Sequence, residues 1–350
     1  MSLVEKVVEH SSKTMKSRGI RGVTNLIAQR MEFSNKNSIV NSTPNYIQIE
    51  PTLRCNLDCT FCSSDIRGRT DKNMTLEEFK KILSQFPMLD SINLQGVGEP
   101  LLNPEFFEMI KYAKTKNIWV YSITNATFVN EKMAQKIIES GIDVLGISLD
   151  GVKKETYESA RINGKFDQVI KNIKILTDTI KKANSSHPEV LITVVANTNN
   201  ISELPDLIKL AKELGVKKVN IQNMHYWGHN EILETIFSAE SLVTQQQPMQ
   251  KTAKDIFNEC RTIGKEIGVK VILPNEKECF FPWTTTYISV EGYVTPCCIG
   301  ASDPRIINFG NILEKPFAEI WNSQRYQQFR NGLRDHEPHH ICENCIYYKK

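Results

Sequence analysis

Three cysteines stand close together in the stretch Cys55-Asn56-Leu57-Asp58-Cys59-Thr60-Phe61-Cys62, shortly after the apolar run Tyr46-Ile47-Gln48-Ile49. Three thiolates on one tight loop can hold three irons of a cubane cluster and leave the fourth iron open to another ligand. A structural zinc site would need four closed ligands, usually contributed as C-x₂-C pairs. The C-x₃-C-x₂-C spacing, with an aromatic residue before the last cysteine, therefore favours an iron–sulfur cluster over zinc or an inert group of cysteines.

The length and charge of the chain limit its possible domain organisation and partners. A chain of 350 residues can form one large core plus an additional module. The net charge of +3 gives no reason to expect a nucleic-acid or anionic-membrane partner. Residues 1–30 interleave apolar and charged residues, unlike a signal peptide, and apolar runs such as 190–196 are too short to span a bilayer. We therefore expect a soluble cytoplasmic protein.

The remaining cysteines point to a second metal-binding region. Nine cysteines in a chain without a secretory signal indicate metal ligation rather than disulfides. After Cys62 there is none until Cys260, and five more follow, at Cys279, Cys297, Cys298, Cys342 and Cys345.

Short β-rich runs alternate with amphipathic helices from residue 46 onward. We expect strands at 46–51, 91–96, 118–124, 143–149, 190–196 and 217–222, and helices near 75–86, 104–116, 130–140, 155–183 and 202–214. Such alternation indicates an α/β fold with a parallel sheet and right-handed crossovers. Six units predict a partial (β/α)₆ barrel, open on one side, with its chemistry at the carboxyl ends of the strands.

The chain divides into four predicted parts. Residues 1–45 form an N-terminal helical extension, in two pieces near 4–15 and 23–30, that caps the bottom of the barrel. This extension looks too short, and too poor in strands, for a leader-peptide-binding module. The barrel core covers 46–230. Residues 231–270 form a polar, Gln-rich bridge and a helix near 248–267, and residues 271–350 carry the second cysteine group.

The C-terminal part is predicted to be a small hairpin-plus-helix auxiliary cluster domain. Two β-rich segments flank Gly292, and a hairpin there would bring Cys279 and Cys297 to neighbouring positions. A helix near 317–333 returns the chain to Cys342 and Cys345. Four cysteines from two such pairs can complete either one tetrahedral metal site or one fully ligated [4Fe–4S] cluster.

Together these patterns resemble the radical S-adenosylmethionine (radical SAM) superfamily with a C-terminal SPASM/twitch-type auxiliary domain. The turn Gly96-Val97-Gly98-Glu99-Pro100 looks like the family's Gly-Gly-Glu-Pro segment, which binds the amino group of SAM, although Val97 stands between the glycines. The spacing C-x₁₂-G-x₄-C, the run Phe309-Gly310-Asn311-Ile312 and the run Glu319-Ile320-Trp321-Asn322 resemble the auxiliary domain. The likeness covers roughly residues 46–350.

The resemblance implies a set of ligands. Cys55, Cys59 and Cys62 would hold a [4Fe–4S] cluster whose open iron binds SAM. One auxiliary [4Fe–4S] cluster would be held by Cys279, Cys297, Cys342 and Cys345, because a full SPASM module has further cysteines that are missing here. The expected SAM contacts are Phe61, Gly96, Gly98, Glu99, Asn125, Ser148, Asp150, Arg161 and Asn197, with Asn199 as a further polar residue.

Some of these residues have an ordinary structural alternative. Phe61 would pack on adenine or fill the small core of its own loop. Arg161 would pair with the SAM carboxylate in the bidentate geometry that suits guanidinium, or lie on a helix surface. Glu99 could be a structural carboxylate, and Asn197 an ordinary loop residue.

The implied reaction is a radical oxidation. The reduced first cluster would split SAM to a 5′-deoxyadenosyl radical that removes a hydrogen atom from the substrate, and the auxiliary cluster would take up the remaining electron. We expect an oxidoreductase for a small polar metabolite, such as an amino sugar or aminocyclitol alcohol, served by flavodoxin or ferredoxin. The alternatives are a peptide-modifying maturase or cross-linking enzyme, an epimerase, or a zinc-stabilised binding module without catalysis.

Three residues are candidates for direct chemistry on the substrate. His225 and His229 lie beyond the sixth strand, where a substrate would bind, and could accept a proton. Cys298 could be an alternative cluster ligand, a hydrogen-atom donor or a buried thiol, and Cys260 is expected to be a buried thiol.

Overall fold

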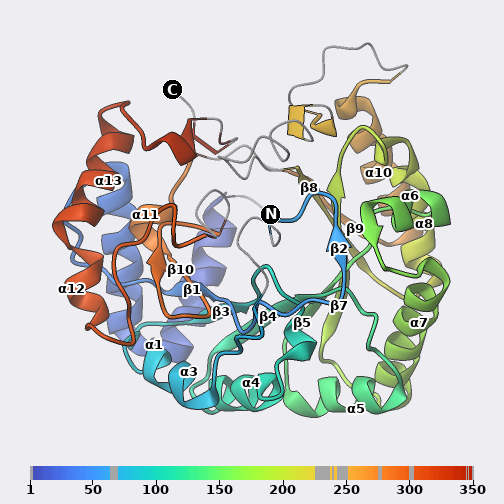
Figure 1. Ribbon diagram of the computed structural model, residues 1–350, viewed down its shortest axis with the longest axis horizontal. Coiled ribbons are helices and arrows are strands. Elements are labelled where there is room, and N and C mark those ends of the chain that lie inside the picture. The colour runs from blue at the N-terminus through green and yellow to red at the C-terminus, as the bar shows by residue number, and fades with distance from the viewer. Residues whose placement is uncertain are drawn as a thin grey trace.

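The computed structural model describes residues 3–63, 70–224, 237–238, 240–242, 251–274, 278–298, 303–343, 345 and 347–348, with side chains from Thr14 onward. Its centre is a nine-stranded sheet in the order β11-β10-β1-β3-β4-β5-β7-β8-β9. Figure 1 shows the strands forming the inner wall of an open barrel, with helices around the outside. The predicted α/β class is therefore confirmed.

Six parallel strands follow one another across the sheet, each close to its predicted bounds. They are β1 (Tyr46–Ile49), β3 (Ser91–Leu94), β4 (Trp119–Thr124), β5 (Val144–Ser148), β7 (Glu189–Ala196) and β8 (Lys218–Asn223). Their outward side chains pack with the helices in one continuous core, which includes Ile47, Ile92 and Val120, all fully buried. Burial of this apolar layer is the main force that holds the barrel wall.

Helices cover the outside of the sheet. They are α3 (Leu76–Leu83), α4 (Phe106–Thr115), α5 (Glu131–Ser140), α6 (Lys154–Ala160), α7 (Phe166–Lys182), α8 (Leu204–Glu213) and α10 (Ala253–Ile267), with the short η1 (Pro100–Leu102) and η2 (Ile201–Glu203). Three of them, α3, α5 and α10, begin at a residue whose side chain caps the helix. Thr75 and Glu78 form a capping box at the start of α3. Gly141 ends α5 in the left-handed conformation at φ 74°.

The prediction of a single helix over 155–183 is wrong. The chain instead leaves α6 at Ala160, forms the short strand β6 (Arg161–Ile162) and enters α7 at Phe166. Asn163 adopts a left-handed φ of 71°, which an α-helix cannot accommodate. The break brings Arg161 to the cysteine loop.

The sheet continues beyond the six strands at both edges, which the sequence did not predict. β9 (Lys270–Ile272) pairs in parallel with β8. At the other edge, β10 (Tyr287–Ile288) pairs in parallel with β1, and β11 (Val294–Thr295) returns antiparallel after Gly292 at φ 89°. The predicted hairpin is confirmed, and it extends the barrel sheet rather than standing apart from it.

A buried carboxylate ties the hairpin to the barrel. Glu50 is fully buried directly after β1. Its Oε1 accepts a hydrogen bond from the backbone N–H of Val97 at 3.0 Å, and its Oε2 accepts one from Val290 at 3.1 Å. Hydrogen bonds to a charged acceptor are the stronger kind, so one side chain fixes both the turn after β3 and the C-terminal hairpin.

The two ends of the chain pack against each other beside the barrel, as Figure 1 shows. The elements are α1 (Leu3–Ser34), α11 (Phe281–Thr284), α12 (Phe317–Trp321), α13 (Gln324–Arg334) and η3 (His340–Cys342). The two expected N-terminal helices are one helix, kinked at Gly19. Arg18 donates to the carbonyl of Leu89 at 2.8 Å, just before β3 begins, so this part of α1 reaches the N-terminal end of the barrel.

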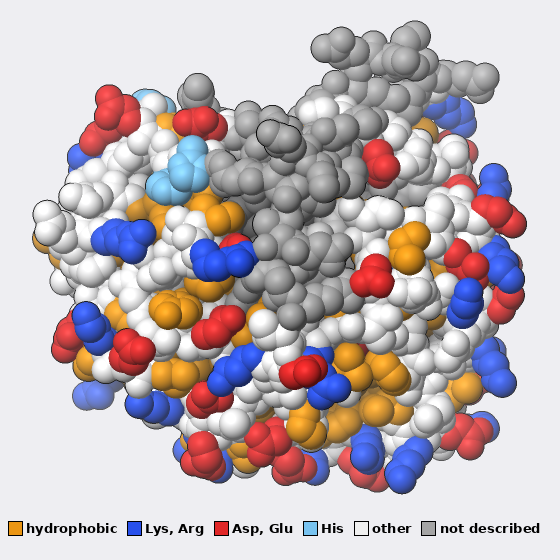
Figure 2. Space-filling model, in the orientation of Figure 1, with side chains coloured by type: hydrophobic (Ala, Val, Ile, Leu, Met, Phe, Trp, Pro, Cys, Tyr) orange, Lys and Arg blue, Asp and Glu red, His pale blue; other side chains and the backbone are white. Residues whose placement is uncertain are grey.

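The surface carries charges of both signs. Figure 2 shows acidic and basic side chains interleaved on the face it presents, without a broad field of one sign. Of the helices that the structure describes, none has the length and apolarity required to cross a membrane.

Candidate active site

A two-stranded sheet holds the first cysteine loop in place. β2 (Asp58–Cys59) pairs antiparallel with β6, so that Cys59 lies opposite Arg161. The backbone N–H of Thr60 also donates to the carbonyl of Ala160 at 3.0 Å. The loop that carries the three cysteines is thus fixed to the segment between α6 and α7.

The glycine turn after β3 packs directly against the start of the same loop. A Cβ atom on Gly98 would lie 2.4 Å from the carbonyl oxygen of Thr52 and 2.7 Å from that of Arg54. Only glycine permits this approach. The backbone N–H of Glu99 then donates to the carbonyl of Arg54 at 2.8 Å. The glycine requirement at Gly98 is therefore a packing requirement that places Glu99 beside the cysteines.

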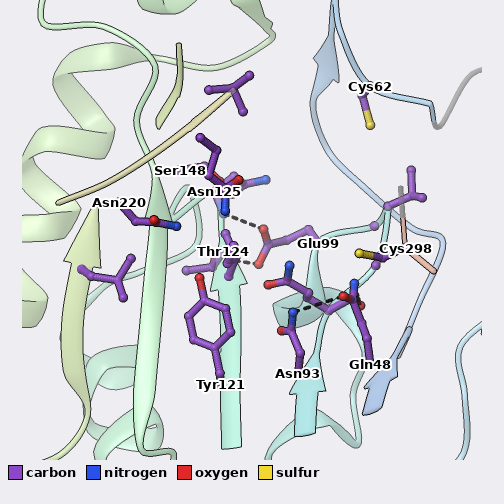
Figure 3. Close-up of a pocket in the computed structure, with 18 of the residues that line it drawn as sticks. Gln48, Cys62, Asn93, Glu99, Tyr121, Thr124, Asn125, Ser148, Asn220 and Cys298 are labelled. Atoms are coloured by element: carbon purple, nitrogen blue, oxygen red, sulfur yellow. Dashed lines mark hydrogen bonds between the residues drawn. The ribbon is translucent and has the colours of Figure 1, made fainter. Parts of the chain in front are cut away.

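Glu99 is 3% exposed and well bonded. Its Oε1 accepts a hydrogen bond from Thr124 Oγ1 at 2.6 Å, and its Oε2 accepts one from the backbone N–H of Asn125 at 2.7 Å, as Figure 3 shows. Burial nevertheless raises the pKa of Glu99. A nearby ammonium group would favour the charged form, so the environment fits the amino group of SAM.

Arg161 lies between an acid and a cysteine. Its Nε and Nη2 both donate to Asp150 Oδ2 at 2.6 Å, its Nη1 lies 3.6 Å from Cys59 Sγ, and its guanidinium is 5.8 Å from the ring centre of Phe61. Burial alone would lower the pKa of Arg161, but the charges of Asp150 and Cys59 outweigh it and raise the pKa. This permanent cation suits a thiolate-ligated cluster and a carboxylate beside it.

One cavity of about 730 Å³ joins most of the predicted residues. The lining residues that the sequence singled out are Cys55, Cys59, Cys62, Phe61, Gly96, Gly98, Glu99, Asn125, Ser148, Arg161 and Cys298. They come from the ends of four neighbouring strands and from both cysteine regions. The cavity therefore extends from the first cysteine loop to the C-terminal part of the chain.

Asp150 and Asn197 do not line this cavity, and the expectation that they contact SAM is not supported. Asp150 is fully buried behind Arg161, and its Oδ1 accepts the backbone N–H of Val195 at 2.7 Å. Asn197 closes the turn after β7, where its Oδ1 accepts the N–H groups of Asn199 and Asn200. Both orient neighbouring parts of the site. His225 and His229 lie outside the described residues.

The four C-terminal cysteines share one buried neighbourhood. Burial raises the pKa of Cys342, and nearby Cys297, Cys279 and Cys345 raise it further. Burial likewise raises the pKa of Cys279, against a hydrogen bond from the N–H of Phe281. Buried thiols that repel each other when charged, with backbone donors aimed at them, are the donor set that a [4Fe–4S] cluster needs.

This neighbourhood is not a preformed site for a single ion. Within the described ranges, no three His, Cys, Asp or Glu side chains converge closely enough to hold one metal ion. The fit to a cluster rests on the chemistry and burial of the thiols.

The two remaining cysteines differ in their surroundings. Cys260 lies in α10, is fully buried in the hydrophobic core, and does not line the cavity. Cys298 lines the cavity close to Tyr46 and Tyr347, and burial raises its pKa to about 12. A thiol with this pKa stays protonated at neutral pH.

A row of polar residues on the cavity wall was not predicted from the sequence. Gln48, Asn93, Gln95, Tyr121 and Asn220 all line it, from β1, β3, β4 and β8. No motif marks them. The available signal was alternation, because strands of a parallel sheet covered on both faces are normally apolar throughout, whereas β1, β3 and β8 carry a polar side chain at every second position.

Two family models match the chain. The radical SAM superfamily model matches residues 49–211, and the SPASM model, an iron–sulfur cluster-binding domain, matches residues 279–346. The chain is a radical SAM enzyme with a SPASM domain. Its cofactors are accordingly a [4Fe–4S] cluster, SAM and an auxiliary iron–sulfur cluster, and the prediction of a radical SAM enzyme is confirmed.

Curated relatives of this radical SAM enzyme have varied names. The tungsten-containing aldehyde ferredoxin oxidoreductase cofactor-modifying protein of Pyrococcus furiosus is 26% identical, over 81% of this chain and 83% of the relative. The AdoMet-dependent heme synthase of Methanosarcina barkeri is 26% identical, over 88% and 90%. The PqqA peptide cyclase of Gluconobacter oxydans is 23% identical, over 86% and 83%.

Among solved structures, Streptococcus suis SuiB bound to the precursor peptide SuiA has a TM-score of 0.65. It is 15% identical, and the match covers 93% of this chain and 74% of SuiB. At this identity the likeness establishes the shared fold.

Proposed function

We propose that this enzyme modifies a peptide, by removing a hydrogen atom from one of its residues, passing the remaining unpaired electron to the auxiliary cluster and releasing a proton to solvent. The small polar metabolite favoured by the sequence becomes the second choice. The observation that carries the proposal is the cavity of about 730 Å³ between the first cysteine loop and Cys298, with its neutral wall of amide side chains. Two relatives named for peptides, the PqqA peptide cyclase and SuiB with its precursor peptide, agree with it.

The electrostatics of the cavity favour a neutral polar substrate. Of the described lining residues, Arg161 and Lys218 carry positive charge. Arg161 is paired with Asp150 at 2.6 Å, and Lys218 is paired with Glu189, also at 2.6 Å. A substrate rich in carboxylates would need unpaired cations to offset the loss of its hydration. Peptide groups need hydrogen-bonding partners, which the amide wall offers.

Each predicted residue would have a separate role in binding the cofactors. Cys55, Cys59 and Cys62 would hold the first cluster, and the Glu99 carboxylate would accept a hydrogen bond from the ammonium group of SAM. Arg161 would neutralise negative charge next to Cys59. A cluster held there would, with SAM, supply the radical chemistry that removes a hydrogen atom from the substrate. Such chemistry requires that the walls exclude water and hold the substrate at one distance.

The position of the second cysteine group supports a role as electron acceptor. Cys297 precedes Cys298, which lines the same cavity. Because β10 extends the barrel sheet next to β1, the second cysteine group is held firmly to the cavity wall. The four thiols would leave no open iron on their cluster, so its role would be to accept an electron rather than to bind substrate.

The test is substrate-dependent cleavage of SAM. Holoenzyme reconstituted without oxygen is incubated with dithionite, SAM and a pool of short blocked peptides that together contain all twenty side chains. We expect 5′-deoxyadenosine above the substrate-free rate, deuterium transfer from labelled peptide and a product lighter by two hydrogens. A matched pool of amino sugars and aminocyclitols is the comparison. Stimulation by that pool alone would overturn the proposal.

Epimerisation of a peptide residue is the one alternative with its own observation, the Cys298 thiol in the cavity wall. An epimerase must return a hydrogen atom to the substrate carbon. In deuterated water its product would gain one deuterium, and a Cys298→Ala variant would lose turnover with both clusters intact. A product lighter by two hydrogens, formed equally by that variant, would exclude it.

A further inference from the structure

Three amide side chains stand in a row on the cavity wall formed by β1 and β3. Gln48 is on β1, Asn93 is opposite it on β3, and Gln95 follows directly after β3. Asn93 Nδ2 donates to Gln48 Oε1 at 3.2 Å, and Gln48 Nε2 donates to the backbone carbonyl of Gln95 at 3.1 Å. Figure 3 shows the amides of Gln48 and Asn93 side by side, facing the interior of the cavity.

Two acceptors in this row have no hydrogen-bond partner. Asn93 Oδ1 and Gln95 Oε1 are both buried, and neither accepts a bond from any described group. Asn93 itself is only 6% exposed. Buried polar atoms are almost always satisfied, and leaving one unsatisfied is costly. Here both atoms belong to residues that line the cavity, where a ligand can supply the missing donors.

The hydrogen bonds of the row fix which way the Asn93 amide points. Gln48 uses its own nitrogen on the carbonyl of Gln95, so its oxygen is left to accept from Asn93. Asn93 must therefore turn its nitrogen toward Gln48 and keep its oxygen for another donor. The two atoms of the row that lack a partner are therefore both oxygen acceptors.

We propose that Asn93 and Gln95 form an amide-reading subsite that accepts hydrogen bonds from substrate N–H groups. The ligand class is an amide, either a peptide-bond N–H or a side-chain carboxamide. The inference rests on the proposed function and narrows it, because the acceptor fixed at Asn93 and the second unpartnered acceptor at Gln95 favour ligands that bring N–H donors, whereas carboxylates bring only acceptors. Sites built to pair a polar group reject analogues that lack it.

The test uses four small probes of nearly equal size: propionamide, N-methylpropionamide, N,N-dimethylpropionamide and propionate. Binding to holoenzyme with SAM is measured by saturation-transfer NMR titration. We expect the two probes with N–H groups to bind at least tenfold more tightly than the dimethyl amide and propionate. Preference for propionamide over N-methylpropionamide would indicate a carboxamide side chain, and equal binding would indicate a peptide bond.

Two variants locate the effect. Asn93→Leu removes one acceptor, and Gln95→Met removes the other while leaving its backbone carbonyl for Gln48. Each should reduce the amide preference to less than threefold. The matched control is Asn172→Leu, because Asn172 is a buried asparagine away from the cavity whose Nδ2 donates to the carbonyls of Ala126 and Thr127.

Stability gives a second readout that does not depend on turnover. Asn172→Leu removes two hydrogen bonds, to the carbonyls of Ala126 and Thr127, and should lower the melting temperature while the amide preference is kept. Asn93→Leu removes one hydrogen bond, to Gln48 Oε1, together with an oxygen that has no partner, and should lower the melting temperature less. Iron content confirms that each variant is loaded.

Two outcomes are kept apart by these measurements. If peptides stimulate SAM cleavage but Asn93→Leu and Gln95→Met retain the full amide preference, the subsite is overturned and the proposed function stands. If the preference depends on both residues but no peptide is turned over, the proposed function fails and the subsite stands. A wild-type enzyme without amide preference also overturns the subsite.

Discussion

Replacing Gly98 by alanine should dismantle the first cluster site from outside its ligand set. The new Cβ would lie 2.4 Å from the carbonyl oxygen of Thr52, whereas ordinary contacts begin at 3.4 Å. The turn must therefore move by about 1 Å, because both obstructing oxygens belong to the backbone. That shift lengthens the 2.8 Å bond from the Glu99 N–H to Arg54 beyond hydrogen-bonding range.

The free-energy cost follows from two contributions. Forcing an extra methyl group into a packed site costs about 1–3 kcal/mol. Leaving a buried N–H unsatisfied costs about another 1–3 kcal/mol. The sum of about 2–6 kcal/mol is a large part of the about 5–15 kcal/mol by which proteins are stable. Because the strain falls on the loop of Cys55 and on Glu99, cluster and SAM binding should suffer before the rest of the fold.

The assay counts iron and acid-labile sulfide after anaerobic reconstitution. Two clusters correspond to about eight irons per chain, and Gly98→Ala should approach about four. Gly215→Ala is the matched control: Gly215 ends α8 at φ 77°, so alanine there costs about 1–2 kcal/mol of backbone strain without touching the loop. If Gly98→Ala retains full iron and SAM affinity, the turn does not pack on the loop as described.

Three further predictions concern buried groups elsewhere in the chain. Cys342→Ala should lose about four irons while SAM cleavage by the first cluster persists. Cys260→Ala should keep its full iron content. Loss of iron from the Cys260→Ala variant would contradict the proposed ligand set. Asp150→Asn leaves the buried Arg161 without its counter-charge and should cost about 3–5 kcal/mol of unfolding free energy, measured by urea denaturation; a cost below about 1 kcal/mol would show that the pair is solvated. Burial raises the pKa of Cys260 to about 12, so the folded state keeps this proton while the unfolded state loses it above about pH 8.5. Holoenzyme stability should therefore fall as pH rises, by about 2 kcal/mol at pH 10 from this group, and Cys260→Ala should flatten that slope; an unchanged slope would mean that the thiol is not buried in solution.

Local chemistry was readable along the chain. The cysteine spacings, the capping box at Thr75 and the alternation of strands and helices each involve residues close in sequence. Local interactions therefore largely determine these features, and they can be predicted without the tertiary structure. For the same reason the six barrel strands lie near their predicted bounds. The break after Ala160 was missed because a left-handed Asn163 is a local choice that helical periodicity does not display.

Pairings between distant segments could not be read. β2 and β6 have two residues each, and β10 joins the edge of β1 from far along the chain. Strands this short have no pattern of their own, and tertiary context decides their pairing.

Side-chain direction at the strand ends was equally undetermined. Ser148 and Asp150 are two residues apart, which on a regular strand would place them on the same face. Beyond β5 the chain leaves the strand geometry, and Asp150 turns behind Arg161 while Ser148 lines the cavity.

The sequence by itself predicted which thiols would hold the first cluster, because the spacing of Cys55, Cys59 and Cys62 within one loop is a local property. Only the tertiary structure decided what that cluster faces. The amide row of Gln48, Asn93 and Gln95 comes from two strands separated by a helix, and its unpaired oxygens become apparent only when every neighbouring donor is placed. Ligand sets follow from local chemistry, whereas a substrate wall follows from non-local packing.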